Sequence, residues 1–371
     1  MKIKRIHIYK RSLPLIEPFI IALGPIDQAQ NVVVKVETEG GDYGLGECSP
    51  YPTIHGETQE GNWVIGQWMA RGWIGKEALD IEERMKELDR LITGNPCIKS
   101  AFDMALYDLK AKSKGMPLYQ MLGGGNEGMV VTDMTVSLNG VPEMVAQAMR
   151  FARAGFPVLK IKLGGTPEED VKRIVAIRQA IGMELPLRID ANQGWTVDAA
   201  IGILRALAPY HIQHCEAPVP RWNRLGLVEV RQQSPIPIMV DEALFDHHDV
   251  QQLLQMQAVD RFNIKLGKAG GIHKALRIAR LATEAGIACQ VGSFSESKLG
   301  ISALLHFAKA CTCVKYFDLD APLMLAEDQT LNGLQYEAGG KVRLPDGPGI
   351  GADLAEAYLQ SLESVSIGAK P

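Results

Sequence analysis

Residues 158–163 read VLKIKL, a short apolar run with two lysines at its end, and runs of the same kind recur along the chain. The best defined are LRIDA at 187–191, IQHCE at 212–216, IMVD at 238–241 and RFNIKL at 261–266. Three further runs lie at 130–136, 287–292 and 316–319. Amphipathic segments of helical period separate the runs, at 142–154, 168–181, 197–207, 249–256, 272–285 and 301–311. Eight strands that alternate with helices through parallel crossovers favour a (β/α) barrel over an open sheet.

The first 125 residues have another pattern, in which strands come first and helices follow. Strands are predicted at 3–8, 31–38 and 43–47, and helices at 60–70, 80–91 and 98–112. The glycine triplet at 123–125 ends this segment, and we interpret it as a linker. The segment after Pro322 has turn signals and a short strand at 341–344, so we expect it to pack back on the first domain. This reasoning divides the chain into 1–125, 126–321 and 322–371.

The composition excludes several classes of protein. The 371 residues carry a net charge of -4 and contain no basic stripe that could neutralise phosphates, so we expect no nucleic-acid partner. No run of about 18 apolar residues is present, so we expect no membrane span. The six cysteines are scattered in apolar settings, which is typical of reduced thiols in a cytoplasmic protein.

Charged residues recur at the ends of the predicted barrel strands. They are Lys162, Asp190, Glu216, Asp241 and Lys265, at steps of 28, 26, 25 and 24 residues. Each step is about one strand-helix unit, so all five residues have the same phase in successive units. Since the chemistry of such barrels lies at the carboxyl ends of the strands, the spacing predicts one shared site.

The middle three of these residues, Asp190, Glu216 and Asp241, are carboxylates. Like charges on adjacent strand ends repel one another unless a cation lies among them. Oxygen ligands without a nearby histidine or cysteine favour Mg²⁺ over zinc. We therefore predict that these three residues bind Mg²⁺.

Lysines flank the predicted metal on both sides, with Lys160 and Lys162 on the strand before it and Lys265 on the strand after it. Nearby positive charge disfavours a lysine's charged form, so we expect a lowered pKa and the ability to act as a base. Two bases astride Mg²⁺ suggest abstraction of a proton α to a carboxylate, through an enediolate that the metal stabilises. One lysine would remove the proton and the other would return one to the opposite face, which is racemisation or epimerisation.

These residues resemble the enolase superfamily, which uses lysine bases with Mg²⁺, and more closely its muconate-lactonising branch. The resemblance covers nearly the whole chain and rests on the following motifs: Gly44-Leu45-Gly46-Glu47, Lys99-Ser100-Ala101, Asp108, Pro117-Leu118, Leu122-Gly123-Gly124, Lys160-Ile161-Lys162, Asp190-Ala191-Asn192-Gln193-Gly194-Trp195, Glu216-Ala217-Pro218, Asp241-Glu242, Lys265 and Gly270-Gly271-Ile272. It implies an α/β fold, a (β/α)7β modified TIM barrel with an α+β capping domain that the C-terminal segment completes. It also implies one Mg²⁺ per subunit, a lysine pair and a homo-oligomer, either a dimer or an octamer.

Within this branch the chain resembles the dipeptide epimerases, in which an Asp-x-Asp at the eighth strand binds the α-ammonium of the substrate. Here these residues would be Asp318 and Asp320. The charges agree, because a dipeptide brings its carboxylate to the metal and needs an anion for its amino end. Two acids would repel the anionic substrates of muconate-type and succinylbenzoate-forming relatives.

The resemblance also implies that capping-domain loops at 19–26 and 49–57 contact the side chain of the C-terminal residue, X. We predict contacts from Gly24, Ile54 and His55, and we consider a charge from Lys298. Alanyl-glutamate epimerases are expected to have an arginine in the first loop, but residues 19–31 contain no Lys or Arg.

We therefore expect an epimerase of L-Ala-L-X dipeptides with a hydrophobic X. Three alternatives remain open. They are an L-Ala-D/L-Glu epimerase, a cycloisomerase or o-succinylbenzoate synthase with Lys162 alone as base, and a non-catalytic binding scaffold.

Overall fold

Eight parallel strands form one curled sheet in this computed structural model, in the order β12-β11-β10-β9-β8-β7-β6-β5. The structure describes residues 1–125, 128–344 and 346–368. The strands are β5 (Met134–Val136), β6 (Leu159–Lys162), β7 (Leu187–Asp190), β8 (Ile212–Glu216), β9 (Ile238–Val240), β10 (Arg261–Ile264), β11 (Ala288–Val291) and β12 (Val314–Phe317). Each neighbour in the sheet is also the neighbour in sequence. This is the parallel order that the apolar runs predict.

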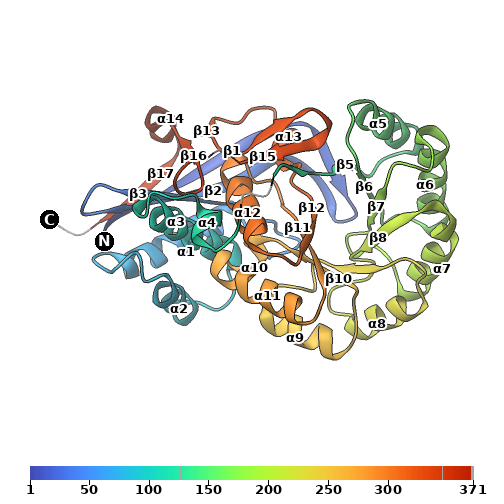
Figure 1. The fold of residues 1–371 in the computed structure, drawn as a ribbon, viewed down its shortest axis with the longest axis horizontal. Helices are drawn as coiled ribbons and strands as arrows, with labels where there is room; N and C mark the ends of the chain where they lie inside the picture. Colours follow the sequence, from blue (N-terminus) through green and yellow to red (C-terminus); the bar gives the residue numbers. More distant parts are fainter. Residues whose placement is uncertain (126–127, 345, 369–371) are drawn as a thin grey trace.

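Helices connect the strands and cover the outside of the sheet, as the arc from α5 to α9 around the right-hand rim of Figure 1 illustrates. They are α5 (Val141–Arg153), α6 (Pro167–Ile181), α7 (Val197–Leu207), α8 (Arg224–Gln233), α9 (His247–Gln255), α11 (Ile272–Glu284) and α12 (Lys298–Ala310). A short helix, α10 (Leu266–Ala269), lies between β10 and α11, and a 3-10 turn, η1 (Ala208–Tyr210), follows α7. The alternation confirms the predicted (β/α)7β barrel.

The first and last strands of the sheet come together through backbone and side-chain contacts. The amide of Asp133, just before β5, donates to the carbonyl of Phe317 at 3.2 Å. Arg188 donates to the same carbonyl at 3.2 Å and to the Asp133 carboxylate at 2.6 Å. Residues 133 and 318, at the two ends of the sheet order, are thereby brought side by side.

Local sequence signals explain where the helices after the strands begin. Thr166 and Thr196 accept hydrogen bonds from the amides three residues later, at 3.4 and 3.3 Å, and so cap α6 and α7. Asn223 caps α8 in the same way. These caps fix the start of each helix directly after the loop that follows each strand, and the loops lie where the barrel carries its site.

An antiparallel sheet in the order β17-β1-β2-β3 forms the capping domain. Its strands are β1 (Ile3–Ile21), β2 (Gly24–Thr38), β3 (Tyr43–Cys48) and β17 (Ser364–Gly368), and the helices beside it are α1 (Gln59–Trp73), α2 (Ile81–Leu91), α3 (Pro96–Ser113) and α4 (Leu118–Met121). A Cβ at Gly44 or Gly46 would lie 2.0 Å from a backbone oxygen of α3, so glycine at both positions lets β3 pack directly on this helix.

The C-terminal segment contributes to both parts of the molecule. Its elements before β17 are α13 (Ala321–Met324), β13 (Thr330–Asn332), β14 (Gln335–Glu337), η2 (Ala338–Gly340), β15 (Lys341–Arg343), β16 (Ala352–Leu354) and α14 (Glu356–Ser361). β17 pairs with β1 of the capping sheet, whereas β15 pairs with β4 (Val130–Val131), which precedes the barrel.

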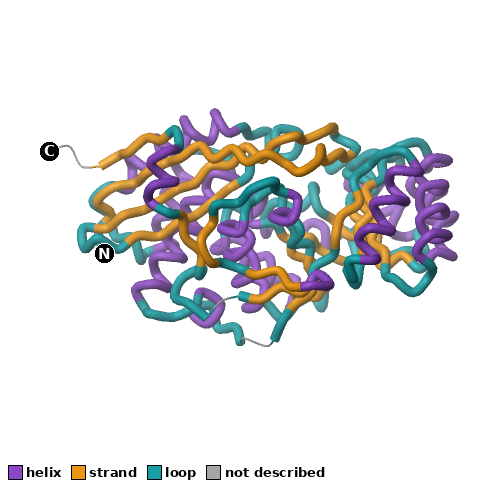
Figure 2. Tube along the Cα trace, turned by 90° about the horizontal axis from the view of Figure 1, so that it is seen from above, coloured by secondary structure: helices purple, strands orange, loops and turns teal. Residues whose placement is uncertain are grey.

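The expected loop at 19–26 is instead the tip of a long hairpin, and that part of the prediction is wrong. Phe19, Ile20 and Ile21 pair with Ile26, Pro25 and Gly24, so β1 and β2 continue almost to the turn. Figure 2 shows these strands running from the end of the molecule that carries the termini toward the barrel. The loop was implied by the family resemblance, whereas the residues of this chain continue the strands up to the turn.

One strand boundary and one helix of the barrel also differ from the prediction. The last strand ends at Phe317 and not at Leu319, so Asp318 follows the strand directly and Asp320 precedes α13. The helix α8 was not predicted because its polar sequence, RLGLVEVRQQ, has little apolar periodicity. Neither difference changes the order of the strands.

Candidate active site

The five residues of shared phase all lie at the same end of the barrel. Lys162, Asp190 and Glu216 are the last residues of β6, β7 and β8, while Asp241 and Lys265 follow β9 and β10 directly. All five side chains are buried. β6 and β10 lie four strands apart in an eight-stranded sheet, so Lys162 and Lys265 project from opposite sides of the barrel.

Lys160 lies among carboxylates and is buried, which rules out a solvated surface lysine. Its Nζ lies 2.9 Å from both Glu216 and Asp318, and 3.2 Å from Asp190. Lys160 and Lys162 point to the same side because they are two residues apart on a strand. The Nζ of Lys162 is 2.7 Å from the same Asp190 oxygen, so one carboxylate contacts both lysines.

The two proposed bases have different surroundings. The Nζ of Lys162 donates to Asp190 and, at 3.0 Å, to the side-chain oxygen of Asn192. The Nζ of Lys265 lies 3.0 Å from Asp241 and 4.5 Å from the centre of the Phe294 ring. Lys265 therefore combines an ion pair with a cation–π contact, both of which favour its charged form.

The pKa values of two lysines are raised, whereas the sequence led us to expect lowered values. Burial alone would lower the pKa of Lys160 and Lys265, but the neighbouring carboxylates outweigh it and raise both. The largest contributions come from Asp318 and Glu216 for Lys160, and from Asp241 for Lys265. The expected lowering therefore depends on a cation that would neutralise these carboxylates.

The three predicted metal ligands fit a hard divalent cation by their donor chemistry. All donors are carboxylate oxygens, and the buried Oδ2 of Asp241 accepts no hydrogen bond among the described residues, although the Nζ of Lys265 lies 3.0 Å away in an ion pair. Asn263 and Gln290 donate to the two oxygens of Glu216 at 2.8 and 3.1 Å, which fixes this carboxylate. Such supporting hydrogen bonds orient ligands in metal sites.

Two further charged residues lie in this site: Lys268, which was not predicted, and Glu242, which was noted at the strand end but given no role. Lys268 contacts the Oδ1 of Asp241 and donates to its backbone oxygen, and it is 1% exposed. Glu242 accepts from Asn192 at 3.1 Å, and burial and the neighbouring Asp241 raise its pKa to about 8. The signal for Lys268 was its position three residues after Lys265, one helical turn on, but α10 was not predicted.

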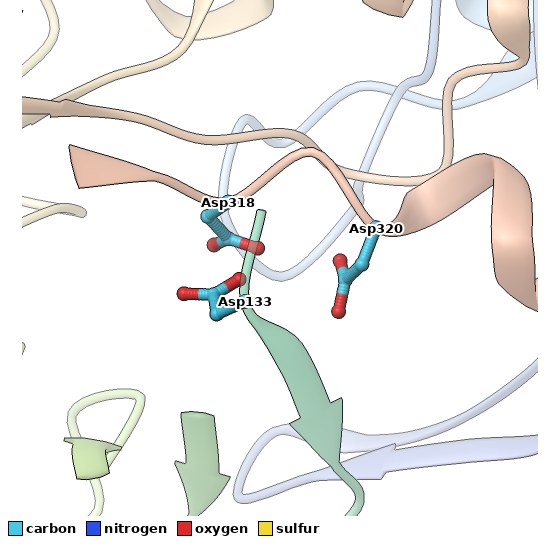
Figure 3. A group of neighbouring side chains, drawn as sticks. All are labelled: Asp133, Asp318 and Asp320. Atoms are coloured by element: carbon cyan, nitrogen blue, oxygen red, sulfur yellow. The ribbon is translucent and has the colours of Figure 1, made fainter. Parts of the chain in front are cut away.

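A second group of acids lies where the two ends of the sheet meet. Carboxylate oxygens of Asp133, Asp318 and Asp320 lie within 4.8 Å of one another, and Figure 3 shows Asp318 and Asp320 on the connection between β12 and α13, with Asp133 just before β5. The predicted ligands Asp190, Glu216 and Asp241 do not form such a group among the described residues, and Lys160 contacts two of them. Asp133 was not predicted, because it lies in the middle of the predicted run 130–136 and not at a strand end, whereas in the structure it directly precedes β5.

The charges of this second group do not cancel. Asp133 pairs with Arg188 at 2.6 Å and Asp318 pairs with Lys160 at 2.9 Å. Asp320 accepts from the backbone amide of Thr135 at 2.7 Å, and burial and the charge of Asp318 raise its pKa to about 7. Asp320 is thus a buried carboxylate without a cationic partner among the described residues.

The capping loops enclose a separate hollow of about 230 Å³. It is lined by Leu23, Gly24, Pro25, Ile26, Gln28, Ala29, Gln30, Ser49, Pro50, Tyr51, Pro52, Thr53 and Ser295. Of the predicted contacts Gly24 is in this lining. Ile54 is buried and its carbonyl accepts from Arg221 at 2.9 Å.

His55 and Lys298 are the remaining predicted contacts. The His55 ring lies 4.4 Å from that of Phe294, the residue over which Lys265 sits, and burial lowers its pKa to about 3. Lys298 is the first residue of α12, and its backbone amide donates to the carboxylate of Asp328 at 2.8 Å. Lys298 lines neither the hollow of about 230 Å³ nor the one that contains the lysines.

Two protein-family models match the chain, and both agree with this fold. Residues 4–123 match "Mandelate racemase / muconate lactonizing enzyme, N-terminal domain", and residues 143–358 match "Enolase C-terminal domain-like". The fold and the site define an enzyme of the enolase-like class. The chain belongs to the mandelate racemase/muconate lactonizing enzyme family within the enolase superfamily.

Curated relatives narrow the class further. The chain is 45% identical to the "D-Ala-D/L-Ala epimerase" of Cytophaga hutchinsonii, over 99% of this chain and 100% of that protein. It is 39% identical to the "Hydrophobic dipeptide epimerase" of Enterococcus faecalis, over 95% and 99%. A solved dipeptide epimerase from Cytophaga hutchinsonii, complexed with Mg and D-Ala-L-Val, superimposes with a TM-score of 0.98 over 99% of this chain and 100% of that one, at 45% identity. The chain is an isomerase.

Proposed function

We propose that the protein is a Mg²⁺-dependent dipeptide epimerase. It moves a proton at the α-carbon of the C-terminal residue of an L-Ala-L-X dipeptide, where X is apolar. The observation that carries the proposal is one hollow of about 40 Å³, lined by Lys162 and Lys265 from opposite sides and by Asp318 and Asp320. Two bases and an anionic site in one enclosure match a substrate with an α-proton and an ammonium group.

Asp190, Glu216 and Asp241 would hold one Mg²⁺. When bound, the cation supplies positive charge that stabilises the deprotonated carboxylate end of a substrate. Lys160, between Asp190 and Glu216, adds a fixed positive charge to the same region. The contacts of Asn263 and Gln290 hold Glu216 in place, so little reorganisation is needed during the reaction.

The two lysines divide the proton transfer between them. The Nζ of one lysine takes the α-proton, and the pair of electrons of the broken C–H bond remains on the substrate. The Nζ of the other lysine then donates a proton to the opposite face of the α-carbon, which inverts its configuration. Lys162 is oriented by Asp190 and Asn192, and Lys265 by Asp241 and Phe294, so each base has a fixed position.

Asp320 supports the assignment of the amino end. Arg188 pairs with Asp133, and Lys160, which also contacts Asp190 and Glu216, pairs with Asp318, so Asp320 is the member of the group without an ion pair among the described residues. Burying a charge without a partner is costly, so a site that retains one is suited to an incoming cation. An α-ammonium is the cation that a dipeptide provides.

The neutral lining of the capping hollow supports an apolar side chain X. None of the residues that line it is charged, and Leu23, Pro25 and Ile26 supply apolar surface. A glutamate side chain would find no cation there, so this feature disfavours the alternative L-Ala-D/L-Glu epimerase. The Cytophaga relative named for alanine and the Enterococcus relative named for hydrophobic dipeptides agree with this choice.

For the cellular context we propose a cytoplasmic homo-oligomer, either a dimer or an octamer, that acts on a small molecule. All six cysteines are free, which agrees with a reducing compartment. Among the described residues, none of the helices has the length and apolar character required to cross a bilayer.

Solvent deuterium incorporation tests the proposed function. The protein is incubated with Mg²⁺ in D₂O with pooled Ala-X dipeptides, with Ala supplied in both configurations, and their masses are measured. A gain of one mass unit in dipeptides with apolar X is expected. The absence of any gain, with Mg²⁺ shown to bind, would contradict the proposal and favour the cycloisomerase alternative.

A further inference from the structure

A hollow of about 250 Å³ lies beside the one that contains the lysines. It is bounded by the hairpin strand β1, by β5 and α5 of the barrel and by α13. Most of its surface is apolar and comes from six side chains: Ile16, Phe19, Met134, Phe151, Leu323 and Met324. Met134 and Phe151 are buried and form its inner wall.

This side hollow is continuous with the proposed reaction site, because Phe19, Thr135 and Met324 line both. The amide of Thr135 donates to the carboxylate of Asp320 at 2.7 Å. On the other side, the Phe19 ring lies 5.8 Å from the Nζ of Lys162. The shared wall therefore stands between the unpaired carboxylate and the apolar hollow.

Polar contacts at the rim hold the hairpin over the side hollow. The amide of Ile20 donates to Ser137 at 2.7 Å, and Glu17 accepts from Gln147 at 3.0 Å and from Arg150 at 2.7 Å. These polar groups form hydrogen bonds with one another at the rim of the side hollow. The inside of the hollow is therefore lined mainly by the apolar side chains. The hollow is thus a formed part of the closed arrangement of hairpin and barrel.

We propose that the side hollow binds the side chain of the N-terminal residue of the dipeptide, and that it accepts apolar side chains as large as leucine or phenylalanine. The inference rests on the proposed function. The carbon that bears the ammonium also bears this side chain. When Asp320 binds the ammonium, the side chain therefore begins beside Thr135 and Met324. Volume and apolar lining then favour a substrate range wider than alanine at this position.

The test uses the full-length protein with Mg²⁺ and dipeptides that end in Ala. Their N-terminal residue is Gly, Ala, Val, Leu or Phe. We expect kcat/KM to be about tenfold higher for Leu-Ala than for Gly-Ala, since apolar contacts in a pocket discriminate on this scale. Leu323→Trp fills the side hollow and should lower the Leu-Ala to Gly-Ala ratio at least tenfold. Leu323→Ala enlarges it and should raise the Phe-Ala to Gly-Ala ratio.

Ile26→Trp is the matched control, because it fills the hollow between the capping loops. It should lower the ratio of Ala-Leu to Ala-Ala and preserve the Leu-Ala to Gly-Ala ratio. Thermal unfolding of each variant establishes that it is folded. Turnover with a Leu-Ala to Gly-Ala ratio that neither Leu323 variant changes would overturn the subsite alone. No turnover of any dipeptide by the unmodified protein would overturn the proposed function as well.

Discussion

The two groups of acids at the barrel mouth differ in how their charges are balanced. Asp190 and Asp241 each lie within 3.2 Å of lysine ammonium groups. In the second group, Asp320 has a backbone amide as its partner and no cation among the described residues. The first arrangement is suited to holding several charges in place, whereas the second is suited to binding one positive charge from outside.

The pKa values express the same contrast. Burial raises the pKa of Asp241, but Lys265 and Lys268 outweigh it and lower the pKa well below its usual range. For Asp320, burial and Asp318 together raise the pKa to about 7. Two buried aspartates of one site thus differ in whether they are ionised in weak acid, because only one has lysines beside it.

The largest effect is expected from the proposed metal ligands. Asp190→Asn and Asp241→Asn should each reduce kcat by about 10³-fold or more, since each removes a ligand and a charge. Asp89→Asn is the matched control, because Asp89 also pairs with two lysines but lies on the capping domain. Turnover by Asp190→Asn close to that of the control would contradict the metal assignment.

Asp320→Asn should lower kcat/KM for dipeptides by about 10²-fold, because an ammonium would lose its charged partner. The same change should increase the free energy of unfolding at pH 8 by up to about 4 kcal/mol, since burial of the ionised carboxylate is no longer required. Kinetics and thermal unfolding measured together test both effects. Unchanged kinetics would mean that another group holds the amino end.

Lys268→Met should weaken Mg²⁺ binding about 10- to 100-fold, because Lys268 positions Asp241. Titration calorimetry with Mg²⁺ measures this change directly. Lys274→Met, which removes a lysine paired with Asp89 at the surface, is the control and should bind Mg²⁺ as the unmodified protein does. Equal affinity in both variants would show that Asp241 needs no support from Lys268.

The smallest effect is expected from pH. Below a pKa of about 7, Asp320 gains a proton and loses its charge, so KM should increase about tenfold between pH 8 and pH 6. The matched comparison is Asp320→Asn, in which the KM increase should disappear. An identical KM profile in both proteins would show that Asp320 does not bind the ammonium.

The barrel and the residues at its strand ends could be predicted from the sequence because both depend on a simple period. A strand and a helix together span about 25 residues, so Lys162, Asp190 and Glu216 recur in phase before any contact is known. Asp318 and Asp320 needed the family resemblance in addition, since their strand is the last and its end was placed two residues late.

What could not be predicted depends on contacts between distant segments. Asp133 precedes its strand and meets Asp318 only because the sheet closes on itself. Lys268 lies in a one-turn helix too short to leave a periodic signal. The hairpin tip at 19–26 was scored as a loop, although pairing with β2 and contacts to Ser137 extend it over the site.

The central claim, that two lysines act on opposite faces of one α-carbon, is tested most directly by α-proton exchange from each epimer of a substrate. The measurement follows ¹H loss by NMR in D₂O for Lys162→Ala and Lys265→Ala, starting from the L and the D form of the C-terminal residue. Each variant should retain exchange with one epimer and lose it with the other, and the two variants should show opposite preferences. Equal behaviour toward both epimers in either variant would contradict the two-base arrangement.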